Sequence, residues 1–261
     1  MADNNKLSVS IQTYLKSGAV QERLEALLDK RANQFTTSLI SVVNSNLLLQ
    51  ECEPKSVLTA AMTAASLDLP INQNLSFAFI IPYRNGRTKQ YEAQFQIGYK
   101  GFIQLAQRSG YYRTINATDV REGEIKKHDH LSGDIEFEWV EDEKEREKLP
   151  VIGYASFFRL HNGFEKTTYM STEKLKAHAK KYSQSYKKGY GLWVDNFDSM
   201  AVKTVLKLLI SKYGPMSTQM QEAILADQAA VDEDSFKYVD NDKTIVESIK
   251  IEPPQKDESQ E

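Results

Sequence analysis

The chain has 261 residues, of which 41% are hydrophobic and 26% charged, and this composition predicts a globular protein of one large domain or two small ones. It shows no apolar run long enough to span a membrane and no amino-terminal stretch of the signal-peptide type. The single cysteine, Cys52, excludes an internal disulfide, so we expect a reducing compartment and a cytoplasmic protein.

The formal net charge of −3 is the sum of segments with opposite signs. Six basic residues and one acidic residue lie between positions 84 and 113, and ten basic and three acidic residues lie between 166 and 213. In contrast, residues 119–149 hold six basic and twelve acidic residues, and residues 221–261 hold four basic and twelve acidic residues. This segregation predicts basic surfaces that suit a polyanion.

The first part of the chain is predicted to be helical. Residues 1–15 are polar and are expected to fray, whereas apolar residues recur near helical spacing between 20 and 49. Pro54 is expected to start a second helix, because its missing N–H costs nothing at the first helical position. Four alanines of that helix predict close packing of another element, either inside the subunit or at a subunit contact: Ala60, Ala61, Ala64 and Ala65.

A β-hairpin is expected over residues 76–97. Two β-rich stretches flank Asn85-Gly86, a dipeptide typical of a two-residue type I′ turn. On the returning strand Gln94 and Gln96 alternate with apolar residues, so one face is predicted to be core and the other a polar platform.

A helix of about ten residues should follow Gly98, with Gly110 at its C-terminal cap. Further strands are expected, with a hairpin turn at Asn162-Gly163. Their predicted ranges are 112–120, 134–140, 151–160 and 164–170. The acidic residues 141–148 are expected to form a solvated loop.

The last third is predicted to be helical and then disordered. Helices are expected from Ser171 to about Tyr186, from about Asn196 to Gly214-Pro215, and onward to about Val231, with a flexible basic loop over residues 187–191. Beyond Val231 the chain is acidic and polar, and it has too little apolar surface to offset the entropy of ordering.

These elements predict an α+β fold in which antiparallel β-hairpins pack with helices. We expect three regions: a helical amino-terminal lobe over residues 1–75, an α+β core over 76–220, and an acidic, mostly disordered tail over 221–261.

The stretch from Gln94 to Arg113 interleaves aromatic residues with cations and amides. Cations attract phosphate, rings stack on bases, and amides bond to sugar or base edges, which is the chemistry of proteins that hold single-stranded nucleic acid without reading its sequence. Within it Lys100, Gln104 and Arg108 recur every four residues on one helical face, although a plain solvated polar stripe would show the same pattern.

Candidate contacts also come from other segments. Lys203 and Lys207 share a helical face beside Asn196 and Ser199, with no acidic residue within one turn, so either an external polyanion relieves their repulsion or they form a solvated lysine face. Further candidate cations and polar groups are Arg84, Arg87, Gln94, Gln96, Arg113, Lys174, Lys176, Lys180, Lys181, Lys187 and Lys188. Candidate stacking residues, for which core packing is the alternative, are Tyr99, Tyr111, Tyr112, Tyr186, Tyr190 and Trp193.

Enzyme classes receive little support. No GxxxxGK[ST] loop is present, so an ATP-driven recombinase or helicase is not expected. His128 and His130 lack a matching Cys or His pair for a metal site. Three acidic residues on one predicted strand face resemble a two-metal nuclease site, but strict alternation with apolar residues accounts for them as an exposed face: Asp134, Glu136 and Glu138.

Three motifs carry a family resemblance. QIGYKGFIQLAQRSG over residues 96–110 resembles the signature of the RecT family of phage single-strand annealing proteins, especially versions from phages of low-GC Gram-positive bacteria. The PYRNGR hairpin before it and the NFDSMAVKTVLKLL helix after it occur in the order typical of that family, and the resemblance covers roughly residues 25 to 220.

The resemblance implies a protein of the bacterial cytoplasm that coats single-stranded DNA left by a phage 5′–3′ exonuclease and anneals it to a complementary strand without ATP. It also implies rings or helical filaments of the chain, with residues 1–75 serving self-assembly and the core over 76–220 binding DNA. The implied fold is similar to that of the eukaryotic single-strand annealing proteins. No cofactor is then expected, with Mg²⁺ accompanying the DNA left open. A passive single-strand-binding protein and, less favoured, a metal-dependent nuclease are the alternatives.

We therefore expect a narrow groove whose walls are the hairpin and the helix over residues 196–213, with cations on the phosphates and Gln94 and Gln96 at the floor. The bases would stay free to test a second strand. The acidic tail is expected to mimic DNA, to dock the exonuclease or the host single-strand-binding protein, or only to aid solubility.

Overall fold

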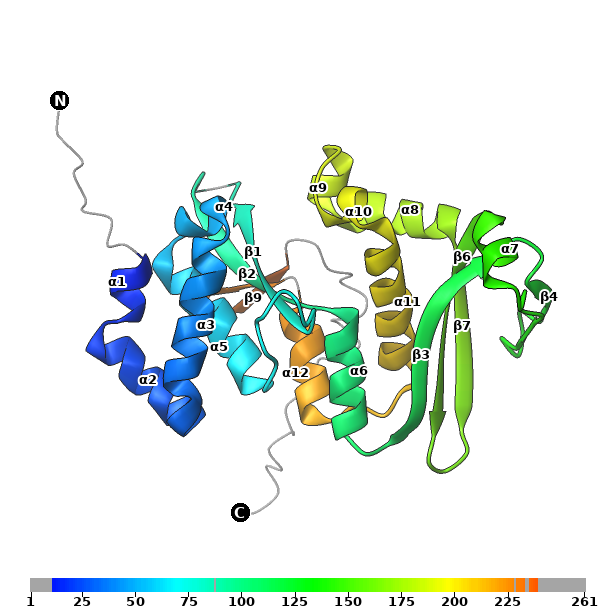
Figure 1. Ribbon diagram of the computed structural model, residues 1–261, viewed down its shortest axis with the longest axis horizontal. Helices are drawn as coiled ribbons and strands as arrows, with labels where there is room; N and C mark the ends of the chain where they lie inside the picture. Colours follow the sequence, from blue (N-terminus) through cyan, green and yellow to red (C-terminus); the bar gives the residue numbers. More distant parts are fainter. Residues whose placement is uncertain (1–10, 87, 228, 233–234, 239–261) are drawn as a thin grey trace, which may run out of the picture.

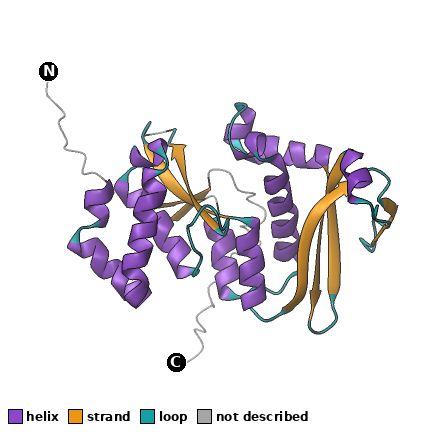
Figure 2. Ribbon diagram, in the orientation of Figure 1, coloured by secondary structure: helices purple, strands orange, loops and turns teal. Residues whose placement is uncertain are grey.

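The computed structural model describes residues 11–86, 88–227, 229–232 and 235–238. It confirms the predicted α+β class, with antiparallel sheets and helices in one chain. Figure 1 shows the amino-terminal helices at one end of the molecule, a three-stranded sheet at the other, and one long helix against that sheet. The same arrangement is seen by element type in Figure 2.

The amino-terminal lobe consists of short helices instead of one continuous segment. They are α1 (Ile11–Leu15), α2 (Gly18–Leu28), the 3₁₀ turn η1 (Asp29–Arg31), α3 (Ala32–Asn44), α4 (Leu47–Gln50) and α5 (Pro54–Ser66). Asp29 has a φ of 49°, which ends α2, and the Asn46 side chain accepts hydrogen bonds from two backbone N–H groups to cap α4. Pro54 is the first residue of α5, as predicted.

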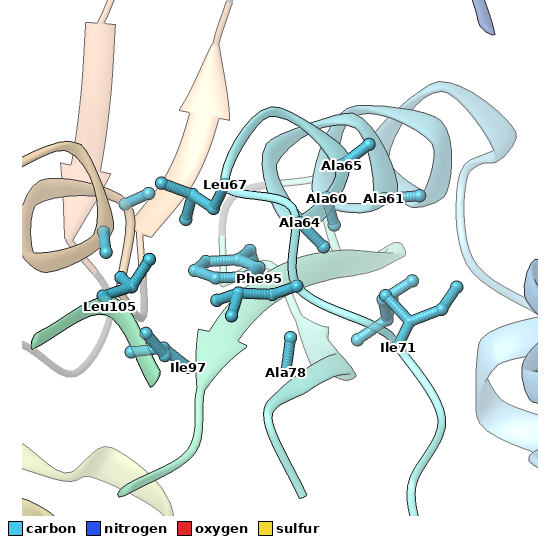
Figure 3. Close-up of a cluster of buried hydrophobic side chains, with 14 of the residues drawn as sticks. Ala60, Ala61, Ala64, Ala65, Leu67, Ile71, Ala78, Phe95, Ile97 and Leu105 are labelled. Atoms are coloured by element: carbon cyan, nitrogen blue, oxygen red, sulfur yellow. The ribbon is translucent and has the colours of Figure 1, made fainter. Parts of the chain in front are cut away.

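The alanines of α5 pack inside the subunit, which decides between the two interpretations of that helix. Ala61 and Ala64 are fully buried, and Figure 3 shows the alanine face of α5 against Phe95 and Ala78 of the hairpin. The small side chains let a sheet approach the helix closely, and they are not free for another subunit.

The hairpin consists of β1 (Ala78–Arg84) and β2 (Tyr91–Ile97), paired with Ile80 opposite Phe95. The connecting loop spans Asn85 to Gln90, and the Asn85 N–H donates to the Gln90 carbonyl at 2.9 Å. The predicted two-residue turn is therefore wrong, because Arg84 pairs with Tyr91 and six residues lie between them.

Helix α6 (Tyr99–Arg108) follows at once, with Gly98 at its N-cap and Gly110 (φ 74°) after its last turn, as predicted. The glycines of this motif serve close packing. A Cβ atom at Gly98 would overlap the Ser76 carbonyl oxygen, and one at Gly101 would overlap the Phe77 carbonyl oxygen. Only glycine lets the start of α6 lie directly against the segment that precedes β1.

The large sheet has the order β3-β6-β7, all antiparallel, from β3 (Tyr112–Arg121), β6 (Val151–Leu160) and β7 (Glu165–Ser171). The turn between β6 and β7 lies at Asn162-Gly163, as predicted, and Gly163 takes a φ of 89° that favours glycine.

An arm leaves this sheet between β3 and β6. It contains β4 (Ile125–His128), β5 (Ile135–Phe137) and the short helix α7 (Glu143–Lys148). The predicted strand over 134–140 is shorter than expected, and the predicted loop over 141–148 is wrong. The chain turns into α7 because Asp142 caps it and because Arg146 reaches the fully buried Glu124, with 2.7 Å between Nε and Oε1.

Helices α8 (Thr172–Tyr182), α9 (Gln184–Lys187), α10 (Leu192–Asp195) and α11 (Phe197–Tyr213) follow β7. Ser171 caps α8 as predicted, although the helix ends at Tyr182 instead of continuing to Tyr186, and Gly214 caps α11 as predicted. Helix α11 contacts all three strands of the large sheet on one side and α6 on another, so it is central to the molecule.

The chain then forms α12 (Thr218–Ala226) and the backbone hairpin of β8 (Ala229–Asp232) and β9 (Ser235–Tyr238). The sequence did not indicate this hairpin. Most of the predicted disordered tail, residues 239–261, lies outside the described residues, as do residues 1–10 that were expected to fray. None of the described helices is both long and apolar enough to cross a bilayer.

Candidate nucleic-acid interface

Helix α11 carries Lys203 and Lys207 one turn apart, and both are buried, at 5% and 6% exposure. The alternative of a solvated lysine face is wrong because α11 is enclosed by the large sheet and by the elements on its other side. Burial of two ammonium groups is costly unless a counter-charge accompanies them.

That counter-charge is Asp227, which directly follows α12 and has no exposed surface. Its Oδ1 accepts a hydrogen bond from Lys203 Nζ and its Oδ2 accepts one from Lys207 Nζ, both at 2.8 Å. Oδ1 also accepts from the backbone N–H of Ile97 at 3.2 Å. The repulsion between the lysines is thus relieved by an internal carboxylate, where the sequence had indicated an external polyanion.

The titration of these groups follows from their burial. Burial lowers the pKa of Lys203 to about 8, with the Lys207 charge acting in the same direction and Asp227 opposing both. Burial alone would raise the pKa of Asp227, but the two ammonium groups hold it below its usual value. Asp227 is therefore a carboxylate at neutral pH.

Gln94 and Gln96 do not form an exposed platform. Both are buried, at 6% and 4% exposure, and Gln96 Nε2 lies 3.8 Å from Met200 Sδ of α11. Among the described residues Gln94 Oε1 is buried without a hydrogen-bond partner, which is uncommon for a buried polar atom. The hairpin and α11 do meet, as the groove hypothesis required, but at a closed contact.

The exposed cations concentrate on α8 and the loop after it. Leu175 and Ala179 pack α8 into a small core with Val205 of α11, which leaves the lysine side of α8 in solvent. The exposed lysines here are Lys174, Lys176, Lys180, Lys181, Lys187 and Lys188. Tyr190, 57% exposed, lies close to them in the chain, so this predicted stacking residue is accessible.

Two other predicted stacking residues are core residues. Trp193 is 7% exposed and packs on Phe197, with 5.6 Å between ring centroids. Tyr112 is 6% exposed, packs edge-on against Phe158, and donates its hydroxyl to the Pro215 carbonyl at 3.0 Å. Neither ring has a free face for a base.

The polar residues of α6 lie in two different environments, solvent at the first turn and the amino-terminal lobe at the last turn. Lys100 is exposed in the first turn, close to Ile97 in the chain. Arg108, in the last turn, donates to the Leu67 carbonyl at 2.5 Å and pairs with Asp68, so it ties α6 to the amino-terminal lobe. Gln104 and Arg108 also line a cavity of about 430 Å³.

The remaining candidates are dispersed. Arg84, Tyr111, Arg113 and Asn196 are exposed, Tyr99 and Tyr186 are half-buried, and Arg87 lies outside the described residues. Tyr112 anchors the strand that carries Arg113 near the carboxyl end of α11, and Lys203 lies ten residues before that end, about 15 Å along the helix. The predicted cations therefore do not all converge on one point.

The acidic strand and the histidines do not assemble a metal site in the described part of the chain, where no group of three or more potential ligands is suitably placed. Glu138 pairs with Lys126 at 3.0 Å, and the His128 ring lies tilted against the His130 ring, with 4.4 Å between ring centroids.

Sequence reasoning missed Asp227 and the pair of Glu124 with Arg146. Asp227 was counted with the acidic tail, yet it stands alone after the apolar stretch of α12. A lone charge beside buried apolar residues is the signal that could have found it, since such a charge needs a partner.

Comparison with known proteins gives concordant results. A family model described as the RecT family matches residues 33–244. The uncharacterized protein YqaK of Bacillus subtilis (strain 168) is 42% identical over 254 residues, which cover 96% of this chain and 82% of YqaK. Protein RecT of Escherichia coli (strain K12) is 28% identical over 229 residues, which cover 83% of this chain and 79% of that protein.

Proposed function

Because the chain belongs to the RecT family, we propose that it is a single-strand annealing protein, which holds single-stranded DNA by its phosphate backbone and pairs it with a complementary strand. The structural observation that supports this proposal is the contact between Gln96 of the hairpin and Met200 of α11, one turn before Lys203. The hairpin and α11, whose contacting residues are about one hundred positions apart in the chain, thus meet beside Lys203 and Lys207.

We propose that the first DNA strand follows the exposed lysines of α8 and the loop after it, and reaches Lys203 and Lys207 at the inner end of its path. Phosphate contacts position a strand without specifying sequence, so the base edges remain free for a second strand. Complementary pairing, and not the protein, then supplies the specificity.

The proposed reaction needs no ATP, because base pairing itself provides the free energy. Each subunit is expected to contact few nucleotides, so stable capture of a duplex would require a row of subunits. An exonuclease that supplies the strand and a single-strand-binding protein that covers it are the partners that we propose.

The test mixes two complementary labelled oligonucleotides without nucleotide triphosphate and follows duplex formation by energy transfer. We expect the protein to accelerate pairing over the spontaneous rate. A protein that binds each strand and slows pairing would instead be a passive single-strand-binding protein. Labelled DNA that is cut when magnesium or manganese is added would contradict the proposal in favour of a nuclease.

A further inference from the structure

The contact between Asp227 and the two lysines has the form of an occupied anion site. Two ammonium groups and one backbone N–H converge on the two oxygens of a single carboxylate. The N–H belongs to Ile97, directly before the N-cap of α6, where the helix dipole favours a negative charge. These are the donors that proteins use to hold phosphate.

A phosphate of DNA matches the carboxylate that occupies this site. A phosphodiester carries a single negative charge, as the Asp227 carboxylate does, and it presents two free oxygens with similar reach. Lys203 and Lys207 each bind a different oxygen of Asp227, which is also how two ammonium groups can share one phosphodiester. A DNA phosphate can therefore replace Asp227 without changing the net charge of the site.

The segment that carries Asp227 is built for release. Helix α12 is fixed in the core by Ala223 and Ile224, both fully buried, but Asp227 ends the helix with an extended backbone. The residues after it form a hairpin of two strands, β8 and β9, which pair with each other and lie beside β2 and α5 through β8. A two-stranded hairpin is only marginally stable by itself, so β8 and β9 are held in place by the contacts of β8 with β2, α5 and α12, and loss of those contacts is enough to free them.

We propose that Lys203, Lys207 and the Ile97 N–H form a phosphate site of the DNA path, and that Asp227 occupies this site in the free protein as an internal competitor that leaves when DNA enters. The inference rests on the proposed function and adds its regulation. The free protein holds its inner cations closed, and a strand of DNA must displace the segment from Asp227 to β9 to engage them.

The first experiment compares Asp227→Asn and Asp227→Ala with the wild type. Binding of a fluorescein-labelled 20-nucleotide oligothymidine is measured by anisotropy, and unfolding in urea is measured in parallel. In the proposed mechanism Asp227 leaves the phosphate site open in less than about a tenth of the free molecules, and the apparent affinity for DNA is reduced by that fraction. We therefore expect the variants to bind oligothymidine at least about tenfold more tightly than the wild type. Glu222→Gln, an exposed residue of α12 with the same change of charge, is the control and should bind like the wild type.

The second experiment needs no substitution, so it tests whether Asp227 leaves the site even if the Asp227 variants fold poorly. Hydrogen exchange of the wild type is followed with and without saturating oligothymidine. We expect the backbone amides of β8 and β9 to exchange faster with DNA bound, while those of α12 before Asp227 keep their protection. Unchanged or slower exchange over β8 and β9, or folded Asp227 variants with wild-type affinity, would overturn the inference.

These results separate the two proposals. A protein that binds oligothymidine and releases β8 and β9, but does not accelerate pairing, would contradict annealing and support the phosphate site. A protein that anneals with β8 and β9 still protected would support the function and contradict the competitor.

Discussion

Lys203 and Asp227 form a buried ion pair, with 2.8 Å between Nζ and Oδ1, that joins the central helix α11 to the end of α12. Lys207 binds the other oxygen of the same carboxylate. The pair lies where the hairpin, α11 and α12 meet, so the residues that the sequence marks for DNA are also residues on which the fold depends.

Removal of both lysines should destabilise the protein. In Lys203→Met with Lys207→Met, Asp227 would be left as a buried carboxylate without its ammonium partners, and a broken buried pair of this kind costs about 3–5 kcal/mol. Addition of Asp227→Asn should restore most of the free energy of unfolding, as measured in urea. The triple variant should still bind oligothymidine more weakly than the wild type. A double variant as stable as the wild type would show that the pair does not support the fold.

The Arg146 side chain should matter for stability far more than other cations of the acidic arm. Its Nε lies 2.7 Å from Oε1 of Glu124, which is fully buried, so Arg146→Met should lower the free energy of unfolding by about 3–5 kcal/mol. Lys148→Met is the matched control, because Lys148 pairs with Glu145 at the same distance in solvent, where such a pair contributes about 0–1 kcal/mol. Equal effects of the two variants in urea unfolding would refute this prediction.

Stability should fall in acid, and Glu124 should be one cause. Burial alone would raise the pKa of Glu124, but hydrogen bonds from Arg146 and from the Arg121 backbone hold it below its usual 4.5. A folded-state pKa below the unfolded value gives stability that is complete above pH 4.5 and is lost as pH falls through the folded-state value. Urea midpoints between about pH 7 and pH 3 should therefore decline less steeply in Glu124→Gln than in the wild type, and parallel curves would contradict this assignment.

Gly98→Ala should destabilise the junction between β2 and α6. The new Cβ would overlap the Ser76 carbonyl oxygen, which belongs to the backbone and cannot turn aside, so we expect a loss of about 1–3 kcal/mol. Gly18→Ala, at the start of α2, serves as control, since in the described part of the chain the new Cβ would meet no atom within 4 Å beyond its chain neighbours and its own helix backbone. That control should be neutral or slightly stabilising in thermal unfolding. Similar losses in both variants would mean that close approach is not the reason for glycine at position 98.

The exposed lysines of α8 should contribute to DNA affinity without contributing to stability. Lys176→Ala with Lys180→Ala leaves the buried face of α8 intact, so unfolding should be unchanged. Oligothymidine binding should weaken, and the logarithmic slope of its salt dependence should decrease by about 0.7 for each phosphate that the variant no longer neutralises. Lys30→Ala, an exposed lysine of the amino-terminal lobe, should change neither quantity. An unchanged salt slope in the double variant would remove α8 from the proposed DNA path.

Much of the secondary structure could be predicted because its signals are local. Pro54 at the start of α5, Ser171 at the cap of α8, Asn162-Gly163 in the turn before β7 and Gly214 after α11 each act through backbone conformation or hydrogen bonds to near neighbours. The errors arose where distant residues decided the outcome. The α7 segment is a helix because Arg146 reaches Glu124, and that carboxylate lies 22 residues away in the chain.

The sequence by itself determined the α+β class, most element boundaries and the residue types that suit single-stranded DNA, since periodicity, turn residues and charge are written along the chain. Only the tertiary structure decided which cations are accessible. Lys203 and Lys180 look alike in the sequence, yet one is buried against Asp227 and the other faces solvent. The physical reason is that exposure depends on what packs against a helix face, and the carboxylate that pairs with Lys203 comes from a segment 24 residues away in the chain.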